Sequence, residues 1–284
     1  MPKPPKIFDR PFVFSMGPQR AGTSWLDRYL RTRGDICLPG EVKEVFFFDR
    51  DYDRGLQHYT AHFKPQPEHD LIMEISTTSF DHPEAPQRLF DAFGKDVKLL
   101  CPLRHPVIRS YSLYLHYRRY GLVSGTLQEA CKQNPHIITS SHYTKNLKRW
   151  MKFYPLKDIN FVFQEELERN QHAYIKSVCK ALNIPFMPAP EEAQERYNVT
   201  TFSKVGFIAT AAQHGADWLR QRRLYAPINF AKAIGLKRII FGKEKPDAQR
   251  GGVPEAEHKW LTKQLLPEVT KLEGLLGRKI KEWD

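Results

Sequence analysis

Short apolar runs alternate with amphipathic stretches along the first two thirds of this chain. Four of these runs are rich in aliphatic and aromatic residues and are predicted to be strands: Phe12–Met16, Leu71–Ile75, Val97–Leu100 and Ile159–Phe163. Between them, apolar side chains recur at the spacing of a helix. Strands that alternate with helices in this way predict an α/β fold, with a central parallel sheet flanked by helices.

Three predicted helices each carry an apolar face that we expect to be core. These faces are Trp25, Leu26, Tyr29 and Leu30, then Ile108, Tyr111 and Leu115, and finally Leu147, Trp150 and Met151.

The last third of the chain is less regular. Prolines follow a predicted helix at Tyr174–Leu182, and Lys243–Pro254 has the composition of an exposed loop. Helical spacing returns from Glu255 to Trp283. We predict a single domain over residues 1–284, with a core of about 10–185 and a helical C-terminal part over 186–284.

The chain is strongly basic, with 44 Lys and Arg against 32 Asp and Glu and a net charge of +12. This charge favours an anionic partner. The basic residues are spread along the chain and match no nucleic-acid-binding motif, so we expect no nucleic acid partner. A basic protein that binds polyanions is kept as an alternative.

Cysteine spacing and the absence of long apolar runs indicate the cellular compartment that we expect for this protein. The four cysteines have no CxxC spacing, and no uncharged run is long enough to cross a membrane. The N-terminus lacks the apolar stretch of a secretory signal. We therefore expect a cytoplasmic protein without an integral membrane segment, and no pattern indicates an oligomeric state.

A phosphate-binding turn is predicted between the first strand and the first helix. Gly17 and Gly22 permit a tight turn, Arg20 adds positive charge, and Thr23 and Ser24 add hydroxyls at the helix start. The alternative is that Thr23 or Ser24 only caps the helix. The turn is P-loop-like, but it lacks the lysine that follows the last glycine in nucleoside triphosphate loops. A kinase or other NTP-binding enzyme is therefore the alternative enzyme class.

A second candidate site follows the strand that begins at Val97. Pro106 is suited to the first position of a helix, so Arg104 precedes that helix and Ser112 lies in its second turn. Both side chains can donate to one phosphate. The alternative is a basic amphipathic helix on which Arg109 is solvated.

Together the two segments resemble the PAPS-dependent sulfotransferases, which use 3′-phosphoadenosine-5′-phosphosulfate. Pro18–Leu26 resembles their 5′-phosphosulfate loop, and Leu103–Tyr114 resembles their 3′-phosphate motif. The resemblance extends over about residues 12–185 and is greatest to bacterial and glycan (heparan) types. It implies PAPS as cofactor, PAP as product and no metal. The cofactor-binding residues that it implies are Arg20, Ala21, Gly22, Thr23, Ser24, Trp25, Arg104 and Ser112, with Arg250 and Gly251 in a closing loop.

Lys43–Asp49 resembles a segment of the glycan-type sulfotransferases that carries the catalytic base. The resemblance implies Glu44 as base, assisted by Lys43 and Arg20, and places Lys43, Phe46 and Tyr143 at the acceptor. Phe46 stands where that family has His, a difference that is expected to alter the acceptor contacts. Ile75 stands where a Lys is expected, and this difference weakens the case for a heparan-type acceptor. The alternative is a surface Lys–Glu pair ahead of a buried Phe run.

Cytosolic sulfotransferases use a His base, for which His58 and His62 are the nearest options. Their spacing would suit a metal, but no third ligand is evident. The sequence therefore predicts sulfuryl transfer from PAPS to a hydroxyl of a carbohydrate or small metabolite.

Overall fold

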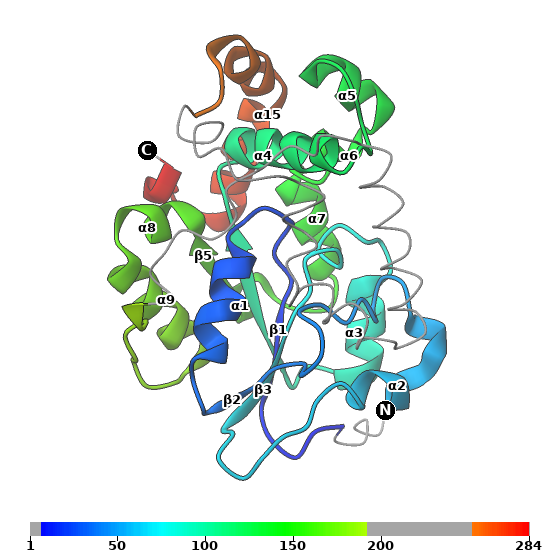
Figure 1. Ribbon diagram of the computed structural model, residues 1–284, viewed down its shortest axis with the longest axis vertical. Helices are drawn as coiled ribbons and strands as arrows, with labels where there is room; N and C mark the ends of the chain where they lie inside the picture. The colour runs from blue at the N-terminus through cyan, green and yellow to red at the C-terminus, as the bar shows by residue number, and fades with distance from the viewer. Residues whose placement is uncertain (1–6, 192–251, 284) are drawn as a thin grey trace, which may run out of the picture. The chain divides into compact units, whose positions relative to one another are not determined.

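The computed structural model describes residues 7–191 and 252–283 (Figure 1). Within them the chain divides into two units. The first unit comprises residues 7–105, 140–191 and 267–283, and the second comprises 106–139 and 252–266. Each unit is described by itself, and the prediction of a single domain stays a prediction.

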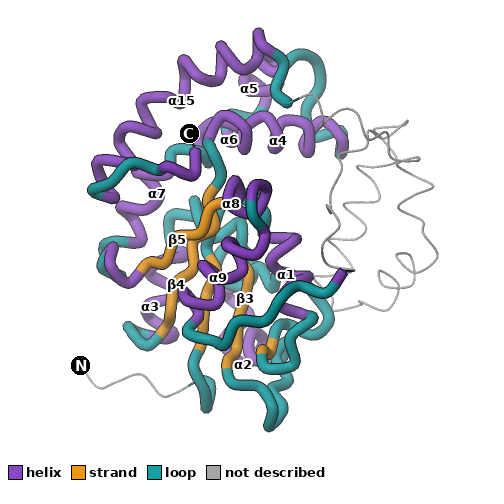
Figure 2. The backbone as a smooth tube through the Cα atoms, turned by 90° about the vertical axis from the view of Figure 1, so that its left-hand side faces the viewer, coloured by secondary structure: helices purple, strands orange, loops and turns teal. Residues whose placement is uncertain are grey.

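The first unit contains a five-stranded parallel sheet in the order β2-β3-β1-β4-β5. Figure 2 shows β4 and β5 running beside each other. The strands are β1 (Phe12–Ser15), β2 (Ile36–Cys37), β3 (Leu71–Ile75), β4 (Val97–Leu103) and β5 (Ile159–Phe163). The predicted α/β class with a parallel sheet is confirmed, and so are the four predicted strands. The two-residue β2 has no apolar run long enough to reveal it.

The two faces of the sheet bury different helices because side chains alternate along each strand. Phe12 and Phe14 of β1 join one core cluster, and Val13 joins the other. The first cluster includes side chains from α2 (Gly55–Thr60), α3 (Ala85–Phe93) and α7 (Tyr143–Trp150). The second includes those of α1 (Thr23–Arg31) and α9 (Gln171–Leu182). The sheet therefore has helices on both faces (Figure 1).

The remaining helical segments of this unit are short, apart from the end of a long C-terminal helix. They are η1 (Tyr52–Arg54), η2 (Leu156–Asp158), α8 (Gln164–Arg169) and η3 (Lys281–Trp283). The long helix, α15 (Glu255–Leu276), contains Pro267, where the two units divide. The predicted helical spacing after Glu255 is thus confirmed.

The second unit is helical in its described part. It contains α4 (Pro106–Arg119), α5 (Leu127–Gln133), α6 (His136–Thr139) and the first half of α15. Leu261 and Leu265 of α15 share a core with Val107, Tyr114 and Leu115 of α4. The apolar face predicted for α4 is confirmed at Leu115, which is buried in this core, and at Tyr111, which is half-buried and packs against it. Ile108 is half-buried and does not belong to this cluster.

Candidate functional site

The carboxyl ends of the strands bring the candidate residues of the first unit to one edge of the sheet. β1 leads into the turn that begins at Gly17, and β3 leads into Ser76 and Thr77. β4 ends at Leu103 just before Arg104, and β5 runs directly into Gln164. β1 lies between β3 and β4, so the direction of the connections reverses there. Open parallel sheets bind ligands at such a point.

The predicted phosphate turn has a backbone that depends on its glycines. A Cβ at Gly17 would lie 2.3 Å from the carbonyl oxygen of Pro102, so a side chain cannot be accommodated there. Gly22 and Arg20 have left-handed φ values of 78° and 71°. Gly22 is the N-cap of α1, and no side chain in the described part of the chain caps this end. The alternative that Thr23 or Ser24 caps the helix is therefore wrong.

The residues of the turn differ in what they can offer a ligand. Ala21 is fully buried, whereas Arg20 and Ser24 are half-buried. Trp25 is buried in the core, where its ring stacks on Tyr29 at 5.6 Å. Its backbone N–H donates to the carbonyl of Gly22. Its side chain thus has a packing role, and the cofactor contact stays a prediction.

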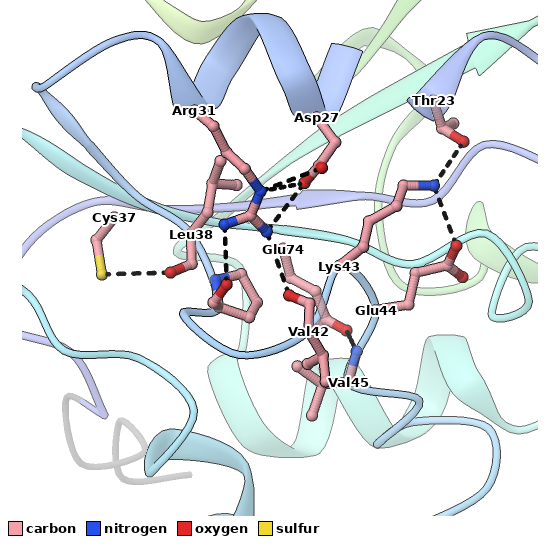
Figure 3. Close-up of polar contacts among 11 residues, drawn as sticks. Thr23, Asp27, Arg31, Cys37, Leu38, Val42, Lys43, Glu44, Val45 and Glu74 are labelled. Carbon is pink, nitrogen blue, oxygen red and sulfur yellow. Dashed lines mark hydrogen bonds and ion pairs between the residues drawn. The ribbon is translucent and has the colours of Figure 1, made fainter. Parts of the chain in front are cut away.

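Lys43 connects the phosphate turn to the candidate base (Figure 3). Its ammonium donates to the hydroxyl of Thr23 at 3.2 Å and to Glu44 Oε1 at 3.1 Å. Side-chain exposure is 28% for Lys43 and 15% for Glu44. The two side chains of a solvated surface pair would be more exposed to solvent than these. The alternative of a simple surface Lys–Glu pair is therefore disfavoured.

The loop that carries Lys43 is held by α1 itself. The Arg31 guanidinium donates to the carbonyls of Pro39 at 3.1 Å and Val42 at 3.2 Å. Asp27, one helical turn earlier, pairs with Arg31 (Figure 3). One helix therefore contributes Thr23 at its start and holds the Lys43 loop from its last turn. Sequence analysis missed Arg31, because only its contacts with the loop reveal this role.

Thr77, just beyond the end of β3, completes the surroundings of Glu44. Its hydroxyl donates to Glu44 Oε2 at 2.7 Å, and its backbone N–H is 3.3 Å from the same oxygen. The carboxylate therefore faces three donors: an ammonium, a hydroxyl and an amide. Sequence analysis noted this segment only for the missing lysine at Ile75 and overlooked the threonine.

A second carboxyl group, Glu74, lies beneath the same loop. It has no exposure to solvent, accepts a hydrogen bond from Val45 N–H at 3.4 Å and lies 2.6 Å from the Tyr59 hydroxyl. Burial raises the pKa of Glu74 to about 8, and the hydrogen bonds only partly oppose this. Glu74 thus supports the backbone next to Glu44, a role that the sequence did not reveal.

Phe46 and Asp49 continue the candidate acceptor segment. Phe46 has a left-handed φ of 59°, which costs energy for an aromatic residue, and the Arg50 guanidinium lies 4.3 Å from its ring centre. Burial raises the pKa of Asp49, whose Oδ1 is 3.3 Å from the Ser79 hydroxyl. This strained segment immediately follows Glu44.

Arg104 and Tyr143 meet through the main chain. Tyr143 is fully buried, and its hydroxyl donates to the Arg104 carbonyl at 2.8 Å. Tyr143 therefore supports the segment that carries Arg104, and the predicted acceptor contact would require it to become exposed. The Arg104 guanidinium donates to Glu168 at 3.1 Å.

Ser112 and Arg109 belong to the second unit. α4 begins at Pro106, as predicted, and Ser112 is buried on it. Arg109 is fully buried and donates to the Ile137 carbonyl at 3.0 Å, so the alternative of a solvated Arg109 is wrong. Arg104 belongs to the first unit, so its pairing with Ser112 stays a prediction. Arg250 and Gly251 lie outside the described residues.

The two histidines named as alternative bases lie beside each other. His62 is buried, and its ring centre is 5.4 Å from that of His58. Across residues 7–191 and 252–283, no group of three or more His, Cys, Asp or Glu side chains is arranged to hold a metal ion. No helix in this part of the chain is both long and apolar enough to cross a membrane.

The known proteins to which this chain is similar include sulfotransferases. The chain is 30% identical over 206 residues to human bifunctional heparan sulfate N-deacetylase/N-sulfotransferase 2, a match that covers 64% of this chain and 23% of that protein. It is 31% identical over 183 residues to mouse heparan sulfate glucosamine 3-O-sulfotransferase 3A1, covering 61% of this chain and 46% of that protein. The chain thus spans under a quarter of the length of the first curated relatives it matches.

A solved structure and a family model extend the comparison to the fold. The structure of a sulfotransferase from Alicyclobacillus acidocaldarius has a TM-score of 0.66 at 21% identity, and the match covers 97% of this chain and 99% of that one. It shares the fold. The model of the sulfotransferase domain matches residues 10–206, which is more than half of the 284 residues. The chain belongs to the sulfotransferase family.

Proposed function

We propose that this chain transfers the sulfuryl group of PAPS to a hydroxyl group of an acceptor, with Glu44 as the general base. One observation carries the proposal. The Lys43 ammonium bonds both Thr23 of the phosphate turn and Glu44. The same ammonium group thereby contacts a candidate base and a candidate phosphate site. Direct transfer of a group between two oxygens requires the base and the donor to lie close together in this way.

The donors present suit a nucleotide with two separate phosphate groups. At the turn, the start of α1 has no side-chain cap among the described residues, and left-handed residues precede it. Backbone N–H groups and a helix dipole favour an anion there. At the end of β4, Arg104 offers a guanidinium, and its Nε is buried without a hydrogen-bond partner in the described part of the chain. Family membership supports PAPS as the nucleotide.

The chemistry then divides among the chain's own residues. When bound, PAPS supplies an activated sulfuryl group, and its transfer leaves the electron pair of the broken S–O bond on the 5′-phosphate of PAP. Glu44 takes the proton of the acceptor hydroxyl while the new O–S bond forms. Lys43 and the N–H groups at the start of α1 place positive charge where the leaving phosphate gains negative charge.

We further propose a carbohydrate or a small hydroxylated metabolite as the acceptor. Support comes from the relatives whose names specify heparan sulfate. Phe46 with Arg50 over its ring presents an apolar and cationic surface beside Glu44, which suits the face of a sugar ring or an anionic acceptor. With phenylalanine rather than histidine at this position, acceptor contacts are expected to differ from those of the heparan-type enzymes.

Thermal unfolding of the full chain with PAP, ATP and AMP tests the cofactor. A ligand at 100 times its Kd adds about 2.7 kcal/mol of stability, so PAP should raise the Tm by roughly 5–10 °C. ATP and AMP should have a much smaller effect. No shift with PAP, or equal shifts with all three nucleotides, would contradict the proposal. Transfer of label from PAPS to a panel of sugars and alcohols then identifies the acceptor.

A further inference from the structure

Arg104, the proposed ligand of the 3′-phosphate, already holds an anion of the protein itself. Its Nη2 donates to Glu168 Oε1 on α8 at 3.1 Å, while its buried Nε has no partner in the described part of the chain. The side chains are 18% and 39% exposed. This single contact with a partly exposed carboxylate leaves other N–H donors of the guanidinium without an acceptor among the described residues. A phosphate has several oxygens that could accept from those N–H groups at the same time.

Gln164 lies one helical turn before Glu168 on α8, and its side chain lies next to Gly22 of the phosphate turn. Its amide nitrogen donates to Glu168 Oε1 at 3.3 Å. Its Oε1 is buried without a hydrogen-bond partner among the described residues, and a Cβ built on Gly22 would lie 1.7 Å from it. Gln164 and Glu168, here named the α8 pair, thus touch both the phosphate turn and Arg104.

The main chain around Arg104 is fixed independently of the α8 pair. The His105 N–H donates to Glu165 Oε1 at 2.8 Å, and Tyr143 donates to the Arg104 carbonyl. Glu165 is held in turn by the indole of Trp283 at 3.1 Å. The guanidinium can therefore exchange Glu168 for another anion without a change in the backbone that carries it.

We propose that Glu168 is a specificity-determining residue that competes with the 3′-phosphate of the nucleotide for Arg104. The inference rests on the proposed function. Exposed ion pairs contribute only about 0–1 kcal/mol, so the exchange is easy. After it, the Glu168 carboxylate remains close to the bound phosphate and repels it. Glu168 therefore weakens the binding of nucleotides that carry a 3′-phosphate and favours release of PAP.

Calorimetric titration of PAP and AMP into three forms of the full chain tests this inference. The forms are the wild type, Glu168→Gln and the control Glu166→Gln, which makes the same charge change on the same helix. Glu168→Gln should bind PAP roughly 2–5-fold more tightly than the wild type, because the competing charge is lost. Its affinity for AMP, which lacks the 3′-phosphate, should be unchanged. Glu166→Gln should match the wild type for both nucleotides.

The same changes in an Arg104→Ala background show whether the effect passes through Arg104. There, Glu168→Gln should raise the affinity for PAP clearly less than it does in the wild-type background, because only the direct repulsion between Glu168 and the phosphate is left to remove. The inference is overturned if Glu168→Gln binds PAP no more tightly than the wild type. Three other results would also overturn it: an equal gain in affinity of Glu168→Gln for AMP, an equal gain in PAP affinity in Glu166→Gln, or an equal gain from Glu168→Gln in the Arg104→Ala background. If neither the wild type nor Glu168→Gln binds PAP, the proposed function fails as well, which is a different result from equal binding by both.

Discussion

Glu44 belongs to a short loop and Glu74 to the strand β3 that contacts this loop at Val45, and the surroundings of their carboxyl groups differ sharply. Glu44 remains partly exposed and faces the Lys43 ammonium and the hydroxyl and N–H of Thr77. Glu74 is completely buried, with only the Tyr59 hydroxyl and the Val45 N–H as partners among the described residues. Burial raises the pKa of Glu74 to about 8, so this group keeps its proton at neutral pH.

Under the proposed function, the two glutamates would have different tasks although they are residues of the same type. A carboxylate that a substrate can reach and that donors orient is suited to accept a proton. A neutral carboxyl group in the core is suited to hold the backbone that carries the first one, as Glu74 does through the Val45 N–H. The surroundings of the two groups therefore suit them to different roles, as is known for enzymes with paired carboxyl groups.

Removing the charge at Glu44 should have the largest effect. We expect Glu44→Gln to lower kcat by about 10²–10⁴-fold, because the amide cannot take the acceptor's proton. PAP binding, measured by titration, should be nearly unchanged. Glu41→Gln is the matched control, since it makes the same change at an exposed position of the same loop and should retain full activity. Normal turnover by Glu44→Gln would exclude Glu44 as the base.

Replacing the ionisable carboxyl group of Glu74 should instead change stability, and in a pH-dependent way. The folded pKa of about 8 lies above the usual value of 4.5, so folding takes up a proton between these pH values. The wild type therefore loses stability as pH rises from 4.5 to 8, by at most about 1.4 kcal/mol per pH unit from this group. Glu74→Gln has no such loss and reproduces the hydrogen bonds of the protonated acid.

Denaturant unfolding at several pH values measures this difference. The stability gained by Glu74→Gln over the wild type should be small near pH 5 and grow until about pH 8, then level off. Contributions of other carboxyl groups cancel, because both proteins contain them. An equal difference at pH 5 and pH 8 would show that Glu74 is not protonated in the folded protein at neutral pH.

The sequence predicts features that depend on neighbouring residues better than features that depend on contacts between residues far apart in the chain. Local patterns were enough for the strands from Leu71 and Ile159, and local motifs were enough to select Glu44 and Arg104 as candidates. Arg31 and Glu168 were not found, because their roles exist only through partners in other elements. No local pattern reports whether a glutamate on a strand, such as Glu74, faces core or solvent.

The alternative of a solvated Arg109 was wrong for a physical reason. On an amphipathic helix this arginine had the pattern of a solvated charge, but its guanidinium donates to the Ile137 carbonyl and is buried. A long side chain can thus reach surroundings that its position in the sequence does not specify. Trp25, by contrast, packs in the core as the apolar face predicted for its helix requires.

The smallest expected effect concerns the hydroxyl that Thr77 adds to the surroundings of Glu44. Thr77→Val keeps the side-chain volume and the backbone N–H but removes the 2.7 Å hydrogen bond to Oε2. A hydrogen bond to a charged group contributes about 1.5–3 kcal/mol at most, and the remaining donors still orient the carboxylate. We therefore expect kcat to fall by roughly tenfold, with the KM for PAPS unchanged.

Thr77→Ser separates this role of the hydroxyl from a general effect on folding. Serine keeps the hydroxyl and lacks the methyl group, so Thr77→Ser should retain most of the wild-type kcat. A structural role of the methyl group alone predicts the opposite, a loss in Thr77→Ser and none in Thr77→Val. The Glu74→Gln background sharpens the result further. If Glu74 supports only the backbone, Thr77→Val should lower kcat by the same factor whether position 74 carries the carboxyl group or the amide. Unequal factors would mean that the two carboxyl groups share one function rather than dividing it.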